Sequence, residues 1–588
     1  MDMRKNILAI AATLFCGVSF AQNNINPTVE VTNTYQGDPS EVHKPQIGMA
    51  IPDSLLRFDM DFGYEVFEKP YQGAYNFKPY MLAMKPDKNA YQGKELYLRA
   101  GAGYSLHPQL DFVFSPERKG PFQMSVYAGH RSYFGKYNNL APEKENDRYK
   151  VDKVSGKSFG GYDALSTIGV EGSYNFDKAI VSFGAGYEGI MAKDTLFRRS
   201  LNAVNLNARI RSNRDDEKYV FYDVRLSGRF GGDSWSGRKL SGSAVTLAGE
   251  AGPVFDPTRA ALLGFEAQTI SYSNLYETNT GKLALIPKYR MTYGKLDMSL
   301  GLRIEVLLNG KVDPEAESKM SMFQTKGGVI FPDVHFRYNA TPSLSLYAEA
   351  TGGNKLNTYS SIISRHHFIN PLNMATPLMD NSVEKVNARI GIEGNAGERL
   401  QVGVSGGFAL VGNGIMDSGM GIIDMKYYAL TGFLPTVSYS DYSLLYADAL
   451  VDYKVGGFRF DGALHLRKTT MKYDADFGLA LPRVSYDVRA RYDITSRIYA
   501  GVRVGGAGAR LGKCWRLSYE IVGAPWEMAP YDVKVPGWFD VGLMGGWQFN
   551  RKIGFWLESG NLLCESIQRS PFYSEKDLWI TAGITLNL

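Results

Sequence analysis

The sequence contains few cysteines and, beyond its first residues, no long apolar run. Only 3 cysteines occur among 588 residues, which excludes a disulfide-rich scaffold. No later segment offers the roughly 20 apolar residues that a membrane-spanning helix needs. If the chain crosses a membrane it must do so with strands, because only helices and closed barrels satisfy every backbone polar group in lipid.

A strong excess of one charge is also missing. The formal net charge is +5 and the basic residues are spread along the chain, so no nucleic-acid partner is predicted. Seven histidines are present, and no nucleophile, phosphate-loop or metal signature accompanies them. We therefore expect no enzyme and no cofactor. His366-His367 lacks metal-site spacing, and His335 and His465 are expected on a polar inner wall.

Aromatic residues and glycine are abundant. The chain has 37 Tyr, 31 Phe and 63 Gly. Tyr and Phe suit strands and membrane interfaces, and Gly is tolerated where strands curve. This composition favours one large barrel over several soluble domains.

Residues 1–21 have the pattern of a secretory signal peptide. Arg4 and Lys5 precede a short apolar run, 7–18, and small residues stand before a cleavage point after Ala21. A lipid-modified Cys16 is disfavoured because a bulky residue precedes it. Cleavage would leave Cys514 and Cys564, which could form a disulfide in the periplasm or remain separate thiols.

Alternation of apolar and polar residues recurs from Glu95 to the last residue. Met298, Leu300, Leu302 and Ile304, for example, alternate with Ser299, Gly301, Arg303 and Glu305, as expected when one face meets lipid and the other a lumen. We count about 22 such segments, a known size for outer-membrane transporters. Pro287 and Pro332 fall inside predicted strands and could mark bulges or strand ends.

The connections alternate in length, which separates a membrane barrel from a soluble sandwich or propeller. Short turns are predicted at 177–178, 256–258, 294–295, 339–342, 395–397 and 550–551. Longer connections are predicted at 188–199, 273–281, 307–327, 353–383, 413–439 and 563–576. Because outer-membrane barrels have short periplasmic turns and long external loops, both chain ends are expected in the periplasm.

Aromatic side chains lie beside the short turns, and the inner face carries both charges. The aromatic residues are Tyr174, Phe176, Tyr293, Tyr338, Tyr453, Tyr492 and Phe549, which indicate an interfacial girdle or simply good strand formers. The candidate lumen charges are Arg209, Arg303, Glu305, Arg389 and Glu393. Such charges can stabilise a wet wall or bind and filter polar solutes.

Several segments resemble the TonB-dependent outer-membrane receptors. They are Asn370-Pro371-Leu372 followed by Asn381, and Asn561-Leu562 followed by the strand 579–588. The start of the mature chain, 26–32, and the stretch 97–104 are similar to a plug-less subgroup of these barrels in Bacteroidetes. The resemblance implies an outer-membrane, receptor-like barrel at 94–588. Only an arm, 22–93, precedes it, which is too short for the family's plug and is expected to extend into the periplasm or partly fill the lumen.

Val29, Val31 and Thr32 lie in a stretch, 28–32, that resembles a TonB box. Such a box acts by adding a strand to the partner's sheet, which β-branched residues favour; an ordinary short strand is the alternative.

The sequence thus predicts an all-β protein: a single antiparallel transmembrane barrel of about 22 strands. Its function is expected to be transport of a solute or participation in an outer-membrane assembly. The alternative is a structural subunit that docks periplasmic partners through the arm. Outer-membrane lipid is the expected surrounding, TonB or another periplasmic protein the expected partner, and no substrate is specified.

Overall fold

The computed structural model describes most of the chain from Glu95 onward. The described residues are 95–104, 107–116, 120–194, 197–213, 219–308, 322–371, 377–397, 399–424, 429–473, 477–518, 527–575 and 578–588. The chain divides into two units, Met1–Pro52 and Asp53–Leu588. The first unit and the predicted arm, 22–93, lie outside the described residues.

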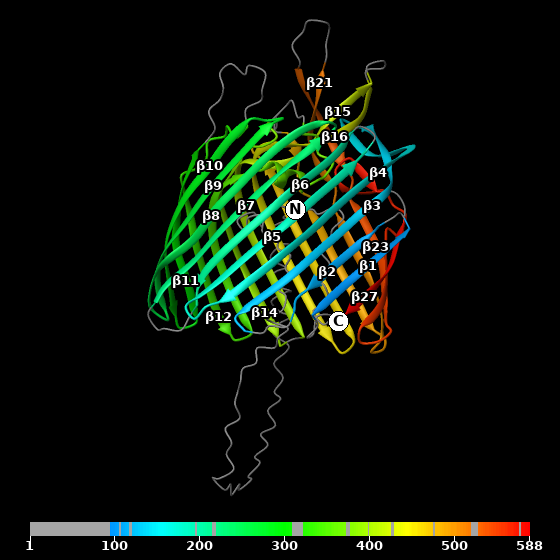
Figure 1. Ribbon diagram of the computed structural model, residues 1–588. Coiled ribbons are helices and arrows are strands. Elements are labelled where there is room, and N and C mark those ends of the chain that lie inside the picture. Colours follow the sequence, from blue (N-terminus) through cyan, green and yellow to red (C-terminus); the bar gives the residue numbers. More distant parts are fainter. Residues whose placement is uncertain are drawn as a thin grey trace, which may run out of the picture. The chain divides into compact units, whose positions relative to one another are not determined.

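Twenty-two strands form a closed antiparallel ring (Figure 1). Its first half consists of β1 (Leu96–Tyr104), β2 (Gln109–Phe114), β3 (Phe122–Glu145), β4 (Arg148–Asn175), β5 (Ala179–Lys193), β6 (Arg198–Ser212), β7 (Tyr219–Trp235), β8 (Arg238–Asp256), β9 (Arg259–Asn274), β10 (Thr278–Tyr293) and β11 (Leu296–Leu308). Its second half consists of β12 (Ile330–Thr341), β13 (Leu344–Leu356), β14 (Asn381–Ala396), β15 (Leu400–Asp424), β16 (Ala429–Val455), β17 (Phe458–Met471), β19 (Val484–Asp493), β20 (Ile498–Ala507), β23 (Trp538–Gln548), β24 (Ile553–Gly560) and β27 (Trp579–Asn587). The predicted fold class and strand number are confirmed.

The ring closes where the last strand pairs with the first. The β1–β27 register runs from Tyr97↔Asn587 to Tyr104↔Ile580. The backbone N–H of Leu96 donates to the carbonyl of Leu588 at 2.9 Å. Closure leaves neither strand with an open edge, which is what a barrel needs in lipid.

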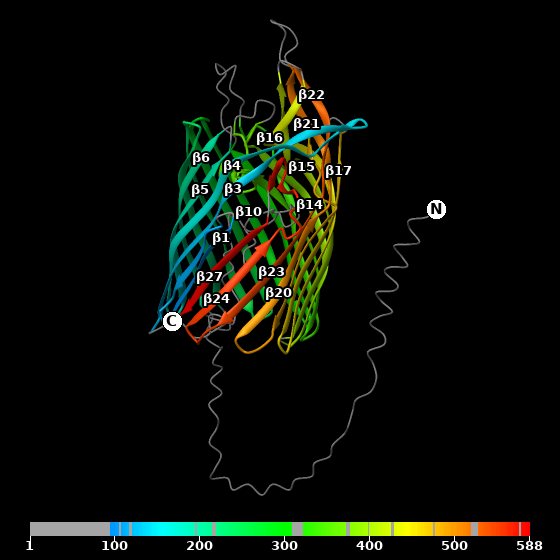
Figure 2. The same cartoon turned by 90° about the vertical axis from the view of Figure 1, so that its right-hand side faces the viewer.

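Within the residues that the structure describes, five further strands lie outside the ring. They are β18 (Gly478–Leu479), β21 (Arg510–Ser518), β22 (Glu527–Val535), β25 (Ile567–Ser570) and β26 (Tyr573–Glu575). The β21–β22 hairpin rises beyond the rim at the end with the long connections (Figure 2). It bridges two ring strands, since β21 pairs with β15 and β22 with β4. This end is extracellular by the rule that relates loop length to side.

The alternation of faces follows the sequence. Leu300, Leu302 and Ile304 are exposed on the outer face, and Leu302 keeps 52% of its surface accessible. Arg303 and Glu305 lie on the opposite face of the same strand, where they pair with other charged side chains. All seven aromatic residues predicted beside the short turns are exposed, which supports the girdle over the plain strand-former interpretation. None of the helices in the described part is long and apolar enough to cross a membrane.

The faces reverse near the extracellular ends of several strands. In β9, Leu263 is exposed on the outer face. Higher in the same strand, Thr269 and Ser271 are the exposed outer residues, whereas Ile270 and Tyr272 are buried on the inner face. Polar outer residues mark where a strand leaves the hydrocarbon, and apolar inner residues show that the lumen is filled with protein at this height.

Three of the predicted longer connections are wrong. Strand β5 continues to Lys193 and β6 starts at Arg198 within 188–199, and β9 continues to Asn274 and β10 starts at Thr278 within 273–281, so both connections are short. Residues 413–439, expected as a long external loop, instead mostly continue β15 and β16 as a paired hairpin from Gly414↔Ser440 to Asp424↔Ala429. A bulge between Val411 and Gly414 shifts the register, and Asn413 adopts a left-handed φ of 49° there. Above the membrane neither face has to be lipid-compatible, so the amphipathic pattern used to recognise strands is lost.

The prolines are accommodated within their strands. Pro287 pairs opposite Leu263 in a continuous β9–β10 ladder. The β10–β11 ladder skips Ile286 and Pro287, on the side where Pro offers no N–H. Pro332 is the third residue of β12 and pairs opposite Leu302.

Candidate functional site: an inward loop above a charged lumen wall

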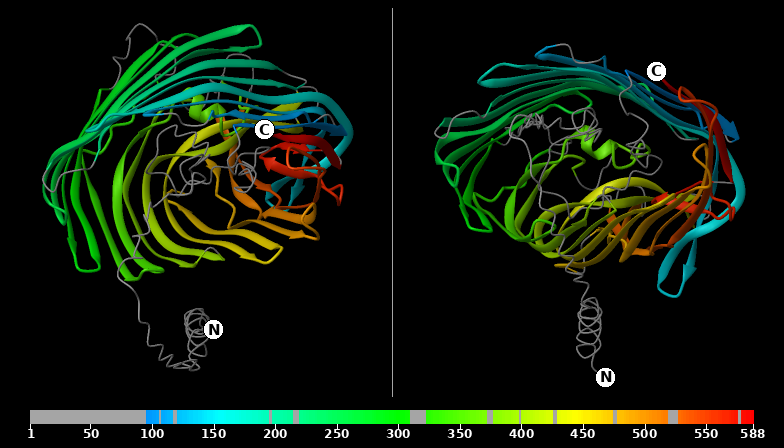
Figure 3. Two further views of the ribbon diagram at one scale, coloured as in Figure 1. Left: turned by 60° about the horizontal axis from the view of Figure 1, so that its bottom comes forward. Right: turned by 90° about the horizontal axis from the view of Figure 1, so that it is seen from below.

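The described residues of the connection between β13 and β14, 357–371 and 377–380, turn into the ring, and Figure 3 shows the helix of this connection inside the circle of strands. Its two ends meet: Asn357 donates from its backbone N–H and its Nδ2 to the carbonyl of Asp380 at 3.0 and 2.9 Å. Asp380 in turn accepts from the backbone N–H of Thr325 at 3.0 Å and from Nδ2 of Asn413 at 2.9 Å. A loop with joined ends is a compact unit, and this one is tied to two further segments of the extracellular end. We call it the inward loop.

A short helix and an apolar cluster hold the inward loop against the wall. Helix α3 (Tyr359–Ile363) has Thr358 as its N-cap, whose hydroxyl accepts from the N–H of Ser361 at 3.2 Å, a normal capping contact. Ile362 and Ile363 are fully buried. The wall residues in this cluster are Ile190, Leu201, Ala203, Leu240, Ile270, Tyr272, Ile415 and Val437. The cluster therefore spans strands β5 to β9 on one side and β15 and β16 on the other.

A buried ion pair fastens the inward loop to β6 and β7. Arg199 Nε lies 2.9 Å from Asp233 Oδ2, and the two side chains are 0% and 1% exposed. The Arg199 guanidinium also donates to the carbonyls of His367 and Ile369, the latter at 2.7 Å. Tyr359 completes the set by donating its hydroxyl to Asp233. Breaking such a pair by removing one partner typically costs about 3–5 kcal/mol, so this contact strongly favours the inward position.

A second charged contact fastens the opposite side. Asp417 on β15 accepts from Arg365 of the inward loop and from Arg510 of β21, each at 2.9 Å. One carboxylate thus connects the inward loop to the hairpin that rises above the rim. Arg365 and Arg510 share the negative charge, which offsets the burial of all three groups.

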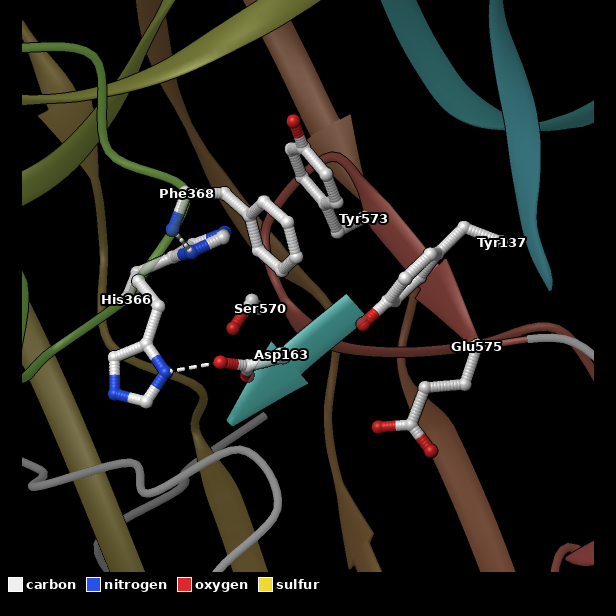
Figure 4. A pocket seen from close by; sticks show the side chains of 8 residues that line it. Tyr137, Asp163, His366, Phe368, Ser570, Tyr573 and Glu575 are labelled. Carbon is white, nitrogen blue, oxygen red and sulfur yellow. Dashed lines mark hydrogen bonds and ion pairs between the residues drawn. The ribbon is translucent and has the colours of Figure 1, made fainter. Parts of the chain in front are cut away.

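Aromatic rings join the inward loop to the connection between β24 and β27. Phe368 stacks on Tyr573 of β26 with ring centroids 4.3 Å apart, and Tyr137 of β3 meets Phe368 edge-on at 5.5 Å. Asp163 binds the ring of His367 at 2.5 Å. These side chains, with His366, line a small pocket between the two connections (Figure 4). Burial lowers the pKa of His366 to about 3, so at neutral pH this contact contains an uncharged imidazole.

Below the inward loop, three of the predicted lumen charges lie in ion pairs. Arg209 Nε is 2.7 Å from Asp223. Arg303 lies 3.0 Å from Glu266 and 2.7 Å from Glu305. Glu305 is fully buried and also accepts from the backbone N–H and the Nδ2 of Asn354, at 2.6 and 2.7 Å. The Glu305 carboxylate is thus held by β13 as well as by its own strand.

The other two predicted charges lie on β14. Arg389 donates to the hydroxyl of Tyr347 at 2.8 Å and lies 3.6 Å from Glu349. Glu393 pairs with Arg337, and both side chains are about half exposed. All five residues therefore have charged or polar partners, and a role for them in binding or filtering a solute stays a prediction.

Several lumen arginines share one local arrangement. Trp556 lies against the inner face at Gly101 and Gly583, where a Cβ would come within about 2.5 Å of its ring. Arg99 stacks over that ring at 3.8 Å and pairs with Glu558. The same order recurs where Tyr499 covers Gly546, Arg491 stacks at 3.7 Å, and Asp493 lies 2.8 Å from Arg491. The glycines make room for flat rings, and each ring supports a neutralised arginine, which produces a polar wall with balanced charge.

The structure is similar to solved outer-membrane receptors. A mutant of the ferric enterobactin receptor PfeA from Pseudomonas aeruginosa superposes with a TM-score of 0.54 at 10% identity, covering 84% of this chain and 80% of that chain. The copper transporter OprC gives 0.57 at 11% identity, with 84% and 80% covered. The siderophore receptor PirA from Acinetobacter baumannii gives 0.52 at 10% identity, with the same coverage. The chain has the fold of a TonB-dependent receptor-like barrel.

Sequence comparisons add nothing to this result: no protein-family model and no curated protein sequence matches the chain. The receptor-like barrel lies in the outer membrane, as predicted. Assignment to the Bacteroidetes subgroup stays a prediction. At these identities the likeness concerns the fold, and at that level the neighbours are receptors and a transporter rather than enzymes.

The remaining predicted residues of the receptor-like barrel are the coupling-box residues, two of the histidines and the two cysteines. The coupling-box residues Val29, Val31 and Thr32 lie outside the described residues. Within the described ranges no cluster of three His, Cys, Asp or Glu could hold a metal ion. His335 bonds to Asp333 at 3.0 Å, and His465 to Asp448 at 2.6 Å. Of the two alternatives for Cys514 and Cys564, the structure shows separate thiols, one buried and one exposed.

Sequence reasoning missed Arg199, Asp233 and Arg365, which fasten the inward loop of this receptor-like barrel. Their partners are 34 to 170 residues away in the chain, and no local motif connects them. One signal was available: Leu201 and Ile270 are apolar on the face that is polar lower in the same strands. Such a reversal indicates protein inside the lumen.

Proposed function

We propose that this chain transports a polar solute across the outer membrane and that the inward loop is its gate. The observation that carries the proposal is the apolar cluster through which the described residues of the inward loop contact β5 to β9 on one side of the lumen and β15 and β16 on the other. A ring of this size encloses a real lumen, so something must fill it to prevent leakage. The inward loop is held by separate contacts, among them two buried charged contacts and one aromatic stack. A gate needs contacts of this kind, because they can be made or broken together.

The wall beneath the gate supports a polar solute. Its arginines are paired with carboxylates, as in Arg99–Glu558 and Arg209–Asp223, so the wall offers hydrogen bonds without a large net field. The PfeA and PirA neighbours are siderophore receptors by name, and OprC is a copper transporter. That range of cargo supports solute uptake as the function class and leaves the solute open. Coupling to TonB through 28–32 belongs to the same proposal.

Single-channel conductance in planar bilayers tests the gate. We expect the wild-type chain to be closed and Arg199→Ala to open a pore, because the substitution leaves Asp233 buried without its main partner. Arg209→Ala is a matched control: it removes an Arg–Asp pair from the same two strands but touches no part of the inward loop. The proposal fails if Arg199→Ala folds yet stays closed, or if both variants conduct equally.

A further inference from the structure

The outer face of the barrel carries a basic and aromatic patch where four neighbouring strands leave the membrane. Phe134 of β3 lies directly opposite Tyr162 of β4, Tyr162 opposite Lys193 of β5, and Lys193 opposite Arg198 of β6. Lys136 lies one step further along the outer face of β3. The five residues thus form one contiguous row across the sheet, and we call it the rim patch.

The rim patch is exposed and its charge is not neutralised. Lys136, Lys193 and Arg198 are all exposed, and within the described part of the chain none of them forms an ion pair. This distinguishes them from the lumen arginines, which have carboxylate partners. The nearest acidic neighbours along these strands, Asp163 and Asp194, point inward and bind His367 and Tyr573.

The height of the rim patch on the barrel wall determines which part of the membrane it faces. Lower on the same strands the outer face is apolar, with Ile168, Tyr187 and Val204 exposed to lipid. The outer residues then become polar at Asn202 and Arg198. The rings of Phe134 and Tyr162, with centroids 5.7 Å apart, lie at this boundary, as expected of interfacial aromatics. The basic residues therefore lie beside the headgroups of the outer leaflet.

We infer that the rim patch binds the phosphate groups of the glycolipid that forms the outer leaflet, lipopolysaccharide. The two rings would pack on its sugar and upper acyl chains while Lys136, Lys193 and Arg198 hold the phosphate. Arg presents a planar fork to phosphate oxygens, and Lys adds a mobile point charge. Basic clusters beside a membrane are attracted to anionic headgroups by roughly 1 kcal/mol each. The binding site is on the outer wall, so it is independent of the solute pathway.

Lipid titration of the full chain tests this. The chain is purified in mild detergent, exchanged free of lipid, and titrated with lipopolysaccharide while intrinsic fluorescence is followed. The triple variant Lys136→Ala/Lys193→Ala/Arg198→Ala should bind about a hundredfold more weakly, because each basic residue contributes about fivefold. Lipopolysaccharide stripped of phosphate should bind the wild type about as weakly. Heat-modifiable migration on gels confirms that the variant is folded.

The matched control removes the same charge from the periplasmic rim. Lys178→Ala/Arg551→Ala/Lys552→Ala changes three exposed basic residues in short turns and should keep the wild-type affinity. The inference is overturned if the rim-patch variant binds as tightly as the wild type, or if the periplasmic control loses as much affinity. It is also overturned if phosphatidylglycerol competes as well as lipopolysaccharide, since the patch would then attract any anionic lipid.

Discussion

Leu302 and Arg303 are neighbours that lie on opposite sides of the barrel wall. Leu302 is half exposed on the outer face, and Arg303 lies between Glu266 and Glu305 on the inner face. At the residue scale the strand period alone sets this division, because successive side chains point to opposite faces. The free-energy cost of a substitution therefore depends on whether its position in the strand faces the lipid or the lumen.

Leu302→Arg should lower the free energy of unfolding by about 2–4 kcal/mol, the cost of a guanidinium facing mid-membrane lipid. Ser299→Arg adds the same group to the inner face of the same strand and should cost less than about 1 kcal/mol. Urea unfolding in lipid vesicles, followed by tryptophan fluorescence, measures both values. Equal losses would show that the two positions do not differ in face.

Arg303→Leu and Glu305→Leu should each be costly, because each leaves a buried charge with fewer partners. We expect about 3–5 kcal/mol for each single variant and clearly less than the sum for the double variant. The more exposed pair Arg209–Asp223 serves as the control, with a coupling of about 1 kcal/mol or less. A double-mutant cycle of unfolding free energies measures the difference, and additive losses at Arg303 and Glu305 would contradict direct coupling.

The inward loop is the element on which the proposed function depends. Its contacts lie at both ends and at its middle: Asp380 at the base, Arg199 and Asp417 along its length, and Phe368 near its centre. Because these contacts reach β6, β15 and β26, displacement of the loop would disturb two ring strands and the connection between β24 and β27. If the loop is a gate as proposed, it should therefore move between two arrangements rather than through a continuum.

Acid should loosen the inward loop. The pKa of His366 is lowered by burial to about 3 in the folded protein, against about 6.5 in an unfolded chain. The unfolded loop therefore binds a proton that the packed loop does not, and the stability present above pH 6.5 is lost as the pH falls toward 3. Asp417, His367 and Arg199 are the charged or titratable groups around the ring.

Conductance measured from pH 7.5 to 4.5 tests this, and channel openings should become more frequent as the pH falls. His366→Gln should remove the dependence, because glutamine cannot be protonated in this range. His367→Gln, which alters the adjacent residue and loses the contact with Asp163, should keep it. An unchanged pH profile in His366→Gln would assign the effect to other groups.

The elements differ in how well the sequence predicts them. Strands such as β11 are predictable because lipid on one side and polar contacts on the other impose an alternation that local sequence displays. The part of the β15–β16 hairpin above the membrane is not predictable in this way, since water and protein on its two faces impose no alternation of apolar and polar residues. The partners of Arg199 cannot be predicted from the sequence either, because a buried ion pair between β6, β7 and the inward loop depends on closure of the whole ring.

At the scale of the whole molecule, the proposed solute uptake includes coupling to TonB through 28–32 as well as a gate. Val31→Pro should abolish solute uptake by whole cells, because proline removes the backbone N–H that strand addition needs. Val31→Ile keeps the N–H and the branched side chain and should preserve uptake. Outer-membrane amounts and closed-state conductance should be the same in both variants. If uptake survives Val31→Pro, the segment 28–32 is not a coupling box.

The pairing of β1 with β27 has a consequence for how the barrel is made. The seam joins Tyr97 to Asn587, so it cannot form until almost the whole chain has been synthesised and exported. The inward loop comes from the middle of the chain, between β13 and β14, so the strands that carry it are exported before β27, which completes the seam. A chain that loses its last strand would keep two unpaired edge strands. The result would be an open sheet that has not finished assembly, rather than a closed barrel with a leaking pore. Biogenesis thus has a built-in order in which the strands that carry the inward loop are exported before the strand that completes the wall.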